Sequence, residues 1–333
     1  METTVPIQYF IPDFVANFPW PRQLNKNYLE VEAETTDWTD SYHLFEEESL
    51  KAGHHVYFEV VRIMSKIFVI FFVIDELSDR GGGEEAIKIH DIVMGALRNP
   101  HKARPQAEHK LGELTRESWV QALEYLSPDA PCIKRFIDGF ENYMTAVIAE
   151  ANDRTNSQYR NFEEYLVLRR NTSGTILSFV VVEFGLDIPD EVYNHPRVQA
   201  LLQNGADLII FVNDLLSYAR EKVQSGGTAF HNSIELLMVE KQLEIQAAIN
   251  ELERRAAEVL SAFVCNRENL PSWGEEIDRR VKIYADGIAY FVRANEAWSF
   301  ETCRYFGTKG LEIQKTRIVT LSPPGSVDTC PVL

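Results

Sequence analysis

The stretch LIIFVNDLLSYARE, residues 208–221, begins as an apolar helix and continues as a polar one. Its first five residues are all apolar, so the helix that contains them is expected to be buried. Asn213, Ser217 and Glu221 follow at positions i, i+4 and i+8, which places an amide, a hydroxyl and a carboxylate along one helical face. A buried polar stripe needs partners, and a metal ion would satisfy all three oxygen donors at once. Because a chance match to this spacing is expected only about 0.002 times per chain, the pattern favours a metal site over an interhelical hydrogen-bonding stripe.

A pair of carboxylates lies upstream, at the end of the most apolar segment of the chain. Residues 67–74 are all apolar, and Asp75-Glu76-Leu77-Ser78-Asp79 follows them. Asp75 and Asp79 are four residues apart, so both carboxylates project from one face of a helix. The C-terminal end of a helix favours cations, and hard oxygen ligands suit Mg²⁺ or Mn²⁺. The alternative is a solvated helix terminus, because such a pair also arises by chance in an acidic chain.

Two basic groups are candidates for binding an anion. Arg304-Tyr305 lies near the end of the last predicted helix, and a guanidinium presents a planar fork that matches two phosphate oxygens. Arg170 precedes Gly174 within a helical stretch, where the glycine predicts a helix break that approaches a ligand. The alternative for each is a surface position, with Arg169 and Arg170 forming a basic pair at a helix end.

The rest of the chain predicts an all-α fold with about ten helices around one core. No segment shows a sustained alternation of apolar and polar residues, and the Pro- and aromatic-rich residues 6–26 predict an extended strap packed on the core. Gly81-Gly82-Gly83 predicts a helix stop. The predicted helices cover residues 28–50, 56–79, 84–98, 114–126, 131–154, 158–186, 197–223, 232–264 and 271–306.

Composition narrows the function further. The chain has 333 residues, 45% of them apolar, which excludes a disordered chain or a collagen-like repeat. Its net charge of −17 repels nucleic acid and anionic lipid, so a phosphorylated substrate would need cations as intermediaries. The four cysteines form no C-x-x-C pair, and the N-terminus lacks a secretory signal, so a cytoplasmic protein is expected. Cys330 begins a prenylation-like box without an upstream polybasic stretch, so no stable membrane anchor is expected.

Taken together, these motifs resemble class I terpene synthases of the fungal sesquiterpene cyclase type. Asp75-Glu76-x-x-Asp79 is similar to the aspartate-rich motif of that family, and Asn213/Ser217/Glu221 to its second metal motif. The resemblance extends from about Trp20 to Gly307. Lys222 resembles the basic residue after the second motif, and Arg170 resembles the diphosphate-sensing arginine, with Ser173 and Gly174 as its linker and effector. His231-Asn232 resembles the lid segment, and residues 298–306 resemble the C-terminal signature.

The resemblance implies a single-domain helical barrel over residues 1–315, with a disordered tail over 316–333. It implies a Mg²⁺-dependent lyase that ionises farnesyl diphosphate and cyclises the allyl cation to a sesquiterpene, releasing diphosphate. About three Mg²⁺ ions would reverse the local charge, with Mn²⁺ as the alternative. Asp75, Asp79, Asn213, Ser217 and Glu221 would bind metal. Arg170, Lys222, Arg304 and Tyr305 would bind the substrate, and Asp75, Arg170, Arg304 and Tyr305 would be catalytic.

The resemblance also implies an apolar pocket of aromatic side chains around the cation. The candidates are Phe68, Phe71, Phe72, Phe179, Trp298 and Phe300, each of which is otherwise a core residue. A monomer and a weak homodimer both fit, and no nucleic-acid partner is expected.

Two alternative functions remain. Trp38 and Asp75 are separated by 37 residues, about twenty fewer than the family pattern and so several helical turns. The missing stretch lies around residues 54–61, and it motivates a catalytically impaired helical pseudoenzyme or binding protein. A chain-elongating prenyltransferase would share the all-α barrel, but that class normally has two aspartate-rich motifs.

Overall fold

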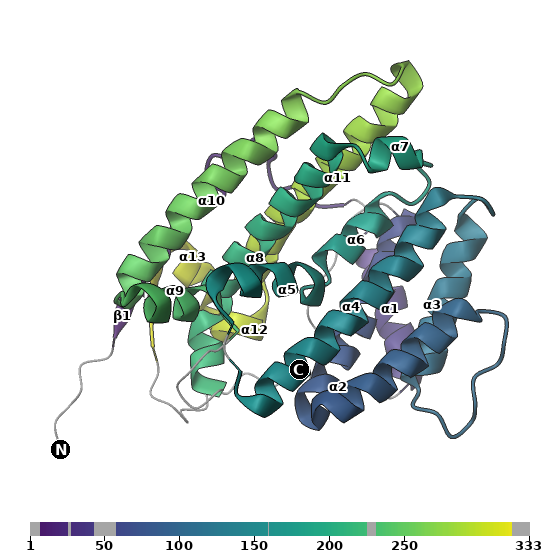
Figure 1. Ribbon diagram of the computed structural model, residues 1–333, viewed down its shortest axis with the longest axis horizontal. Helices are drawn as coiled ribbons and strands as arrows, with labels where there is room; N and C mark the ends of the chain where they lie inside the picture. The colour runs from purple at the N-terminus through teal and green to yellow at the C-terminus, as the bar shows by residue number, and fades with distance from the viewer. Residues whose placement is uncertain (1–6, 26–27, 43–57, 159, 225–230, 322–333) are drawn as a thin grey trace.

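The computed structural model describes residues 7–25, 28–42, 58–158, 160–224 and 231–321. Two short strands pair near the chain ends, and helices make up the rest of the regular structure (Figure 1). The elements are β1 Gln8–Phe10, α1 Tyr28–Tyr42, α2 Phe58–Arg98, α3 Leu111–Tyr125, α4 Pro131–Asn156, α5 Phe162–Thr172, α6 Thr175–Val182, α7 Asp190–Tyr193, α8 Pro196–Gln224, α9 Ser233–Lys241, α10 Ile245–Glu268, α11 Glu275–Glu301, α12 Cys303–Phe306, the 3-10 turn Gly307–Lys309, α13 Gly310–Thr316 and β2 Ile318–Thr320.

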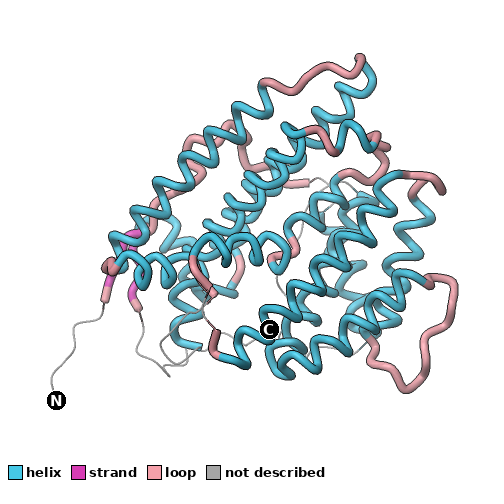
Figure 2. Tube along the Cα trace, viewed as in Figure 1, coloured by secondary structure: helices cyan, strands magenta, loops and turns pink. Residues whose placement is uncertain are grey.

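The all-α prediction is confirmed, but several predicted boundaries are wrong (Figure 2). The break predicted at Gly174 is present, where φ is +67°, and it separates α5 from α6. The stop predicted at Gly81-Gly82-Gly83 falls at Gly82, whose φ of 68° and ψ of −164° are not helical, so α2 consists of two helical stretches joined across a kink. The helix expected over 232–264 breaks at Gln242, where φ is +52°, and this break was not predicted. It depends on a residue with a side chain in the left-handed region, which local composition does not specify. None of the helices in the described ranges combines the length and apolarity needed to cross a lipid bilayer.

Two apolar clusters, rather than the single core expected, hold the helices together. One is built mainly on α2, α3 and α4, and the other on α8, α10 and α11. The short helix α6 lies between these groups and contacts α2, α4, α8 and α11 (Figure 1). Val182 of α6 and Phe291 of α11 pack against both clusters, so they mark the junction between the two halves of the molecule.

Gly174 allows α5 to turn into α6 directly beside α2. Its φ of +67° is a conformation that residues with a side chain rarely adopt. A Cβ atom built at this position would lie 2.8 Å from Cε2 of Phe71. The break therefore needs glycine for two reasons, the backbone conformation and the close approach of Phe71.

The two ends of the described chain pair with each other. Strand β1 lies antiparallel to β2, with Tyr9 opposite Val319, and both of these side chains are buried. Residues 318–320, expected to be part of a disordered tail, are therefore ordered, because they pair with a segment about 300 positions away that no local pattern could reveal. Residues 322–333, the remainder of the expected tail, lie outside the described residues.

The N-terminal segment packs on the core as a strap, as predicted. Phe14, Val15 and Phe18 are buried in the cluster around α8. Arg293 of α11 holds this segment by donating hydrogen bonds to the carbonyl oxygens of Val15, Phe18 and Trp20, at 2.6, 3.3 and 3.1 Å. One guanidinium thus satisfies three carbonyls of a segment that has no regular structure of its own.

Replacement of Gly174 by alanine is expected to lower the free energy of unfolding by about 2–4 kcal/mol, from left-handed strain plus overpacking against Phe71. Phe71→Ala is the control background, because it removes the ring that a Cβ at position 174 would meet and leaves the backbone conformation there unchanged. Urea unfolding of Gly174→Ala in the wild-type and Phe71→Ala backgrounds separates strain from crowding. Equal losses in the two backgrounds would contradict the close approach at Phe71.

Candidate active site

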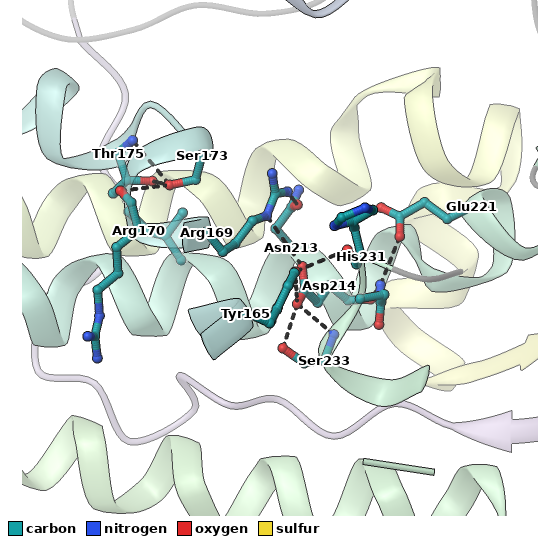
Figure 3. Close-up of polar contacts among 12 residues, drawn as sticks. Tyr165, Arg169, Arg170, Ser173, Thr175, Asn213, Asp214, Glu221, His231 and Ser233 are labelled. Carbon is teal, nitrogen blue, oxygen red and sulfur yellow. Dashed lines mark hydrogen bonds and ion pairs between the residues drawn. The ribbon is translucent and has the colours of Figure 1, made fainter. Parts of the chain in front are cut away.

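Asn213 and Glu221 of α8 have side-chain partners from other elements (Figure 3). The Asn213 side chain accepts a hydrogen bond from Arg169 at 3.1 Å and donates one to the Tyr305 hydroxyl at 2.8 Å. Glu221 accepts a hydrogen bond from Nδ2 of Asn232 at 3.0 Å. The Ser217 hydroxyl is buried and makes no hydrogen bond within the described structure. Burial, followed by the nearby Asp214 carboxylate, raises the pKa of Glu221, and Ser217 and Asn232 oppose this shift only in part.

Arg304 and Tyr305 reach this face from the four-residue helix α12. The hydroxyl of Thr302 caps α12 by accepting a hydrogen bond from the Arg304 amide. The Arg304 guanidinium lies 3.8 Å from the Asp75 carboxylate and 5.3 Å from the centre of the Phe72 ring. A kink between α11 and α12 therefore brings the C-terminal signature beside both α2 and α8.

The Asp75 side chain is accessible at the end of the apolar segment of α2, with 60% of its surface exposed. Desolvation by the surrounding helices nevertheless raises its pKa, which Arg304 partly opposes. A carboxylate that is both accessible and partly desolvated is suited to receive a cation. Asp79 lies one turn further along α2, and its side chain is outside the part of the structure that is described.

Of the two arginines at the end of α5, Arg169 reaches the α8 face and Arg170 does not (Figure 3). Arg170 donates two hydrogen bonds to the Asp207 carboxylate, at 2.7 and 2.8 Å. Asp207 is six residues before Asn213 on α8 and so lies on a different face of that helix. Consecutive residues of a helix point about 100° apart, so only one of the pair can face the site. The structure therefore brings Arg169, and not Arg170, to the face of α8 that carries Asn213.

The electrostatics of Arg169 agree with this position. Burial lowers its pKa, but Tyr165 and the carboxylates of Asp214, Glu150 and Glu221 raise it by more, so the net shift is upward. The guanidinium is thus a permanent positive charge held in the interior by surrounding anions.

Lys222, the basic residue predicted to follow the second motif, does not face the ladder. The Lys222 ammonium group donates hydrogen bonds to both carboxylate oxygens of Glu235 on α9, at 2.8 and 2.7 Å. It is nine residues after Asn213, which places it about 180° around the helix. Arg220, seven residues after Asn213, shares the face of the ladder. Burial and the neighbouring Arg304 lower the pKa of Arg220, while Tyr305, Glu221 and Asp75 raise it, so Arg220 lies among the site residues.

Sequence reasoning also missed Glu150, on α4. Burial raises its pKa, but Arg169, His231 and Arg154 lower it by more, and the net shift is downward. Glu150 in turn raises the pKa of Asp75. No local motif surrounds Glu150, so only the packing of α4 against α2 and α5 brings it to the site.

The aromatic candidates divide into two groups. Phe179 and Phe300 are fully buried, and Phe300 stacks on Phe306, so this residue belongs to the core. Phe291, which was not predicted, stacks on Phe68 at 6.0 Å and meets Phe179 edge-on at 5.9 Å. Phe71 is buried as well, and Phe68 is partly accessible. Phe72 and Trp298 are also partly accessible and lie beside Arg304 and Tyr305, respectively.

The donor set fits a divalent cation. Within the described residues, no three His, Cys, Asp or Glu side chains come close enough to hold a metal ion by themselves. The α8 face instead offers an amide oxygen, a carboxylate and the buried, unpartnered Ser217 hydroxyl. These are hard oxygen donors of the kind that Mg²⁺ and Mn²⁺ prefer, and a cation would satisfy the orphaned hydroxyl.

Comparison with known proteins identifies the family. Residues 66–261 match the family model of terpene synthase family 2, C-terminal metal binding. Sesquiterpene synthase Agr9 of Cyclocybe aegerita is 47% identical over 98% of this chain and 90% of its own length. A Delta(6)-protoilludene synthase of Stereum hirsutum is 37% identical over 94% of this chain and 88% of its own. The chain therefore belongs to the terpene synthase family, a metal-binding one, and to its fungal sesquiterpene synthases.

Solved structures of other terpene synthases have the same fold as this chain. Linalool/nerolidol synthase from Streptomyces clavuligerus superimposes with a TM-score of 0.72 at 19% identity, covering 85% of this chain and 98% of that one. Hedycaryol synthase in complex with nerolidol superimposes with a TM-score of 0.68 at 18% identity, covering 87% and 100%. The single-domain, all-α class I terpene synthase fold is thus confirmed.

Because Arg220 shares the face of the ladder and Lys222 does not, their substitution is expected to affect the binding of inorganic diphosphate with Mg²⁺ differently. Arg220→Gln is expected to weaken binding about 10- to 100-fold, because a charged hydrogen bond contributes about 1.5–3 kcal/mol. Lys222→Gln is expected to leave binding unchanged, because Lys222 faces Glu235. Isothermal titration calorimetry measures both. A loss confined to Lys222→Gln would restore the assignment made from sequence.

Proposed function

We propose that this chain converts farnesyl diphosphate to a sesquiterpene and releases diphosphate, with Mg²⁺ as the cofactor. The names of its relatives support the reaction class, since proteins 47% and 37% identical to it are sesquiterpene synthases. The observation that carries the proposal is the convergence of Arg169, Asn213 and Tyr305, from α5, α8 and α12, in one hydrogen-bonded chain. Asp75 joins it through Arg304.

The metal ions would be held from two sides. Asn213, Ser217 and Glu221 would hold one ion on α8, and Asp75, with Asp79 one turn later, would hold the others on α2. About three ions balance a diphosphate within a chain of this negative charge, and Mn²⁺ is the alternative cation. When bound, the ions supply Lewis-acid stabilisation of the leaving diphosphate.

Three arginines and a tyrosine would bind the diphosphate oxygens. Arg169, Arg220 and Arg304 reach the site from α5, α8 and α12, and Tyr305 adds a hydroxyl donor. The overall charge of −17 opposes an anionic substrate, so these buried positive charges are needed to attract it locally. Forked guanidinium groups also fix the orientation of the phosphate groups.

The chemical step needs no covalent nucleophile. The bond between C1 and the bridging oxygen of the substrate breaks heterolytically, and its electron pair leaves with the diphosphate. The resulting allylic cation is attacked by the π electrons of a distal double bond, which forms the ring carbon–carbon bond. Loss of a proton, or capture by water, ends the sequence as a hydrocarbon or an alcohol.

The aromatic side chains at the junction would stabilise the cation and exclude water. Phe68, Phe72 and Phe291 lie next to the diphosphate-binding groups or between the two apolar clusters. A cation over an aromatic face gains on the order of 0.5–2 kcal/mol. Exclusion of water separates cyclisation from simple hydrolysis of the substrate.

The completeness of the site supports an active enzyme over an impaired one. The shortened interval that motivated the pseudoenzyme alternative includes residues 43–57, which lie outside the described structure. Asp75, downstream of that interval, nevertheless faces Arg304. The Asn/Ser/Glu face of α8 supports cyclisation over chain elongation, which would use a second aspartate-rich motif.

Incubation with farnesyl diphosphate and Mg²⁺, followed by gas chromatography–mass spectrometry, tests the proposal. We expect a fifteen-carbon hydrocarbon or alcohol, reduced by roughly 100-fold or more in Asn213→Ala and in Asp75→Ala, the scale seen when one transition-state stabiliser is removed. Lys222→Gln is the control and is expected to keep the activity of the wild type.

Parallel incubations separate the alternatives. A longer prenyl chain formed after addition of isopentenyl diphosphate would indicate a prenyltransferase. If a folded protein gives no product from geranyl, farnesyl or geranylgeranyl diphosphate, a pseudoenzyme is indicated and the proposal fails.

A further inference from the structure

Asp214, next to Asn213 on α8, is a buried carboxylate that the metal and diphosphate roles leave unexplained. Its side chain is fully buried. One oxygen, Oδ2, accepts hydrogen bonds from the Tyr165 hydroxyl at 2.8 Å and from the amide and hydroxyl of Ser233 at 2.9 and 2.5 Å (Figure 3). Three donors from α5 and α9 therefore fix this carboxylate in one orientation.

The other oxygen of Asp214 faces Arg169. The distance from Oδ1 to Nε of Arg169 is 4.0 Å, and within the described structure neither atom has a hydrogen-bond partner. At the other end of the same guanidinium, Arg169 donates to Asn213. The Asp214 carboxylate thus attracts the guanidinium from its Nε side, whereas the hydrogen bond to Asn213 is donated by a terminal nitrogen.

Asp214 also connects the ladder to the start of α9. Its backbone oxygen accepts a hydrogen bond from Nδ2 of Asn232 at 2.8 Å, and the same amide donates to Glu221. Oδ1 of Asn232 caps α9 by accepting from the Ile234 amide at 2.9 Å. Asn232 therefore contacts both the Asp214 backbone and the Glu221 carboxylate, and it orients the latter.

We propose that Asp214 is a positioning residue, whose buried carboxylate holds Arg169 toward the diphosphate and keeps α5, α8 and the start of α9 in register. It touches neither substrate nor metal, because it lies about 100° around the helix from Asn213 and its contacts are with α5 and α9. This inference rests on the proposed function, specifically on the binding of diphosphate by Arg169. Outer contacts of this kind commonly change ligand affinity by roughly 10- to 100-fold.

The same helix carries a matched control. Asp207, seven residues earlier on α8, is also buried and pairs with Arg170, the residue next to Arg169. Both aspartates neutralise an arginine of α5, but only the Asp214 pair borders the site. Asp214→Asn and Asp207→Asn should therefore both lower the stability of the apo protein, whereas only Asp214→Asn should change ligand binding.

The experiment measures binding of inorganic diphosphate with Mg²⁺ by isothermal titration calorimetry, with apo stability by thermal denaturation. Asp214→Asn is expected to weaken binding by roughly 10- to 100-fold, and Asp207→Asn by less than about twofold. Arg169→Gln should also weaken binding. Adding Asp214→Asn to Arg169→Gln should cause no further loss, because the positioning residue then has nothing to position.

The outcomes separate this inference from the proposed function. Absence of binding by the wild type, or full binding by Arg169→Gln, would overturn the role of Arg169. Normal binding by folded Asp214→Asn, an equal loss in Asp207→Asn, or an undiminished effect of Asp214→Asn in the Arg169→Gln background would overturn the positioning role. Should Asp214→Asn fail to fold, Tyr165→Phe removes one of the three anchoring donors, and unchanged binding by that variant would equally overturn it.

Discussion

The structure depends on one constraint, that helix α8 must pass through the interior while carrying polar side chains. Asn213, Asp214 and Ser217 lie where apolar residues precede and follow them, and unpartnered polar groups in such a place are unfavourable. The partners of Asn213 and Asp214 come from α5, α9 and α12, elements that lie far apart along the chain. The polar groups of α8 thus join three short helices to the interior.

Charge is the second organising factor. A chain with a net charge of −17 places Arg169, Arg220 and Arg304 around one face of α8. Arg169 is balanced by Asp214 and Glu150 while no anionic ligand is bound. Since a buried charge is tolerated only when paired, the same carboxylates that stabilise the fold also prepare the site.

Some of what sequence reasoning missed was available from helical geometry. Lys222 is nine positions after Asn213 and lies on the opposite face, whereas Arg220, seven positions after it, lies on the same one. Counting the helical phase would have selected Arg220. The choice between Arg169 and Arg170 was different in kind, because both end the same helix and only the rotation of α5 against α8 decides which one faces Asn213.

The spacing of residues within one helix is a local property, so the amino-acid sequence was sufficient for the all-α class, the Asn213/Ser217/Glu221 face and the candidate groups at Asp75 and Arg304. Contacts between elements depend on where the chain breaks and how the helices rotate when they pack. Only the tertiary structure could show that Gln242 interrupts a helix, that β1 and β2 pair across the chain, that Glu150 lies beside Arg169, and that Phe291 stacks on Phe68. The physical reason is that helical periodicity repeats every 3.6 residues, whereas packing joins residues whose separation along the chain has no period at all.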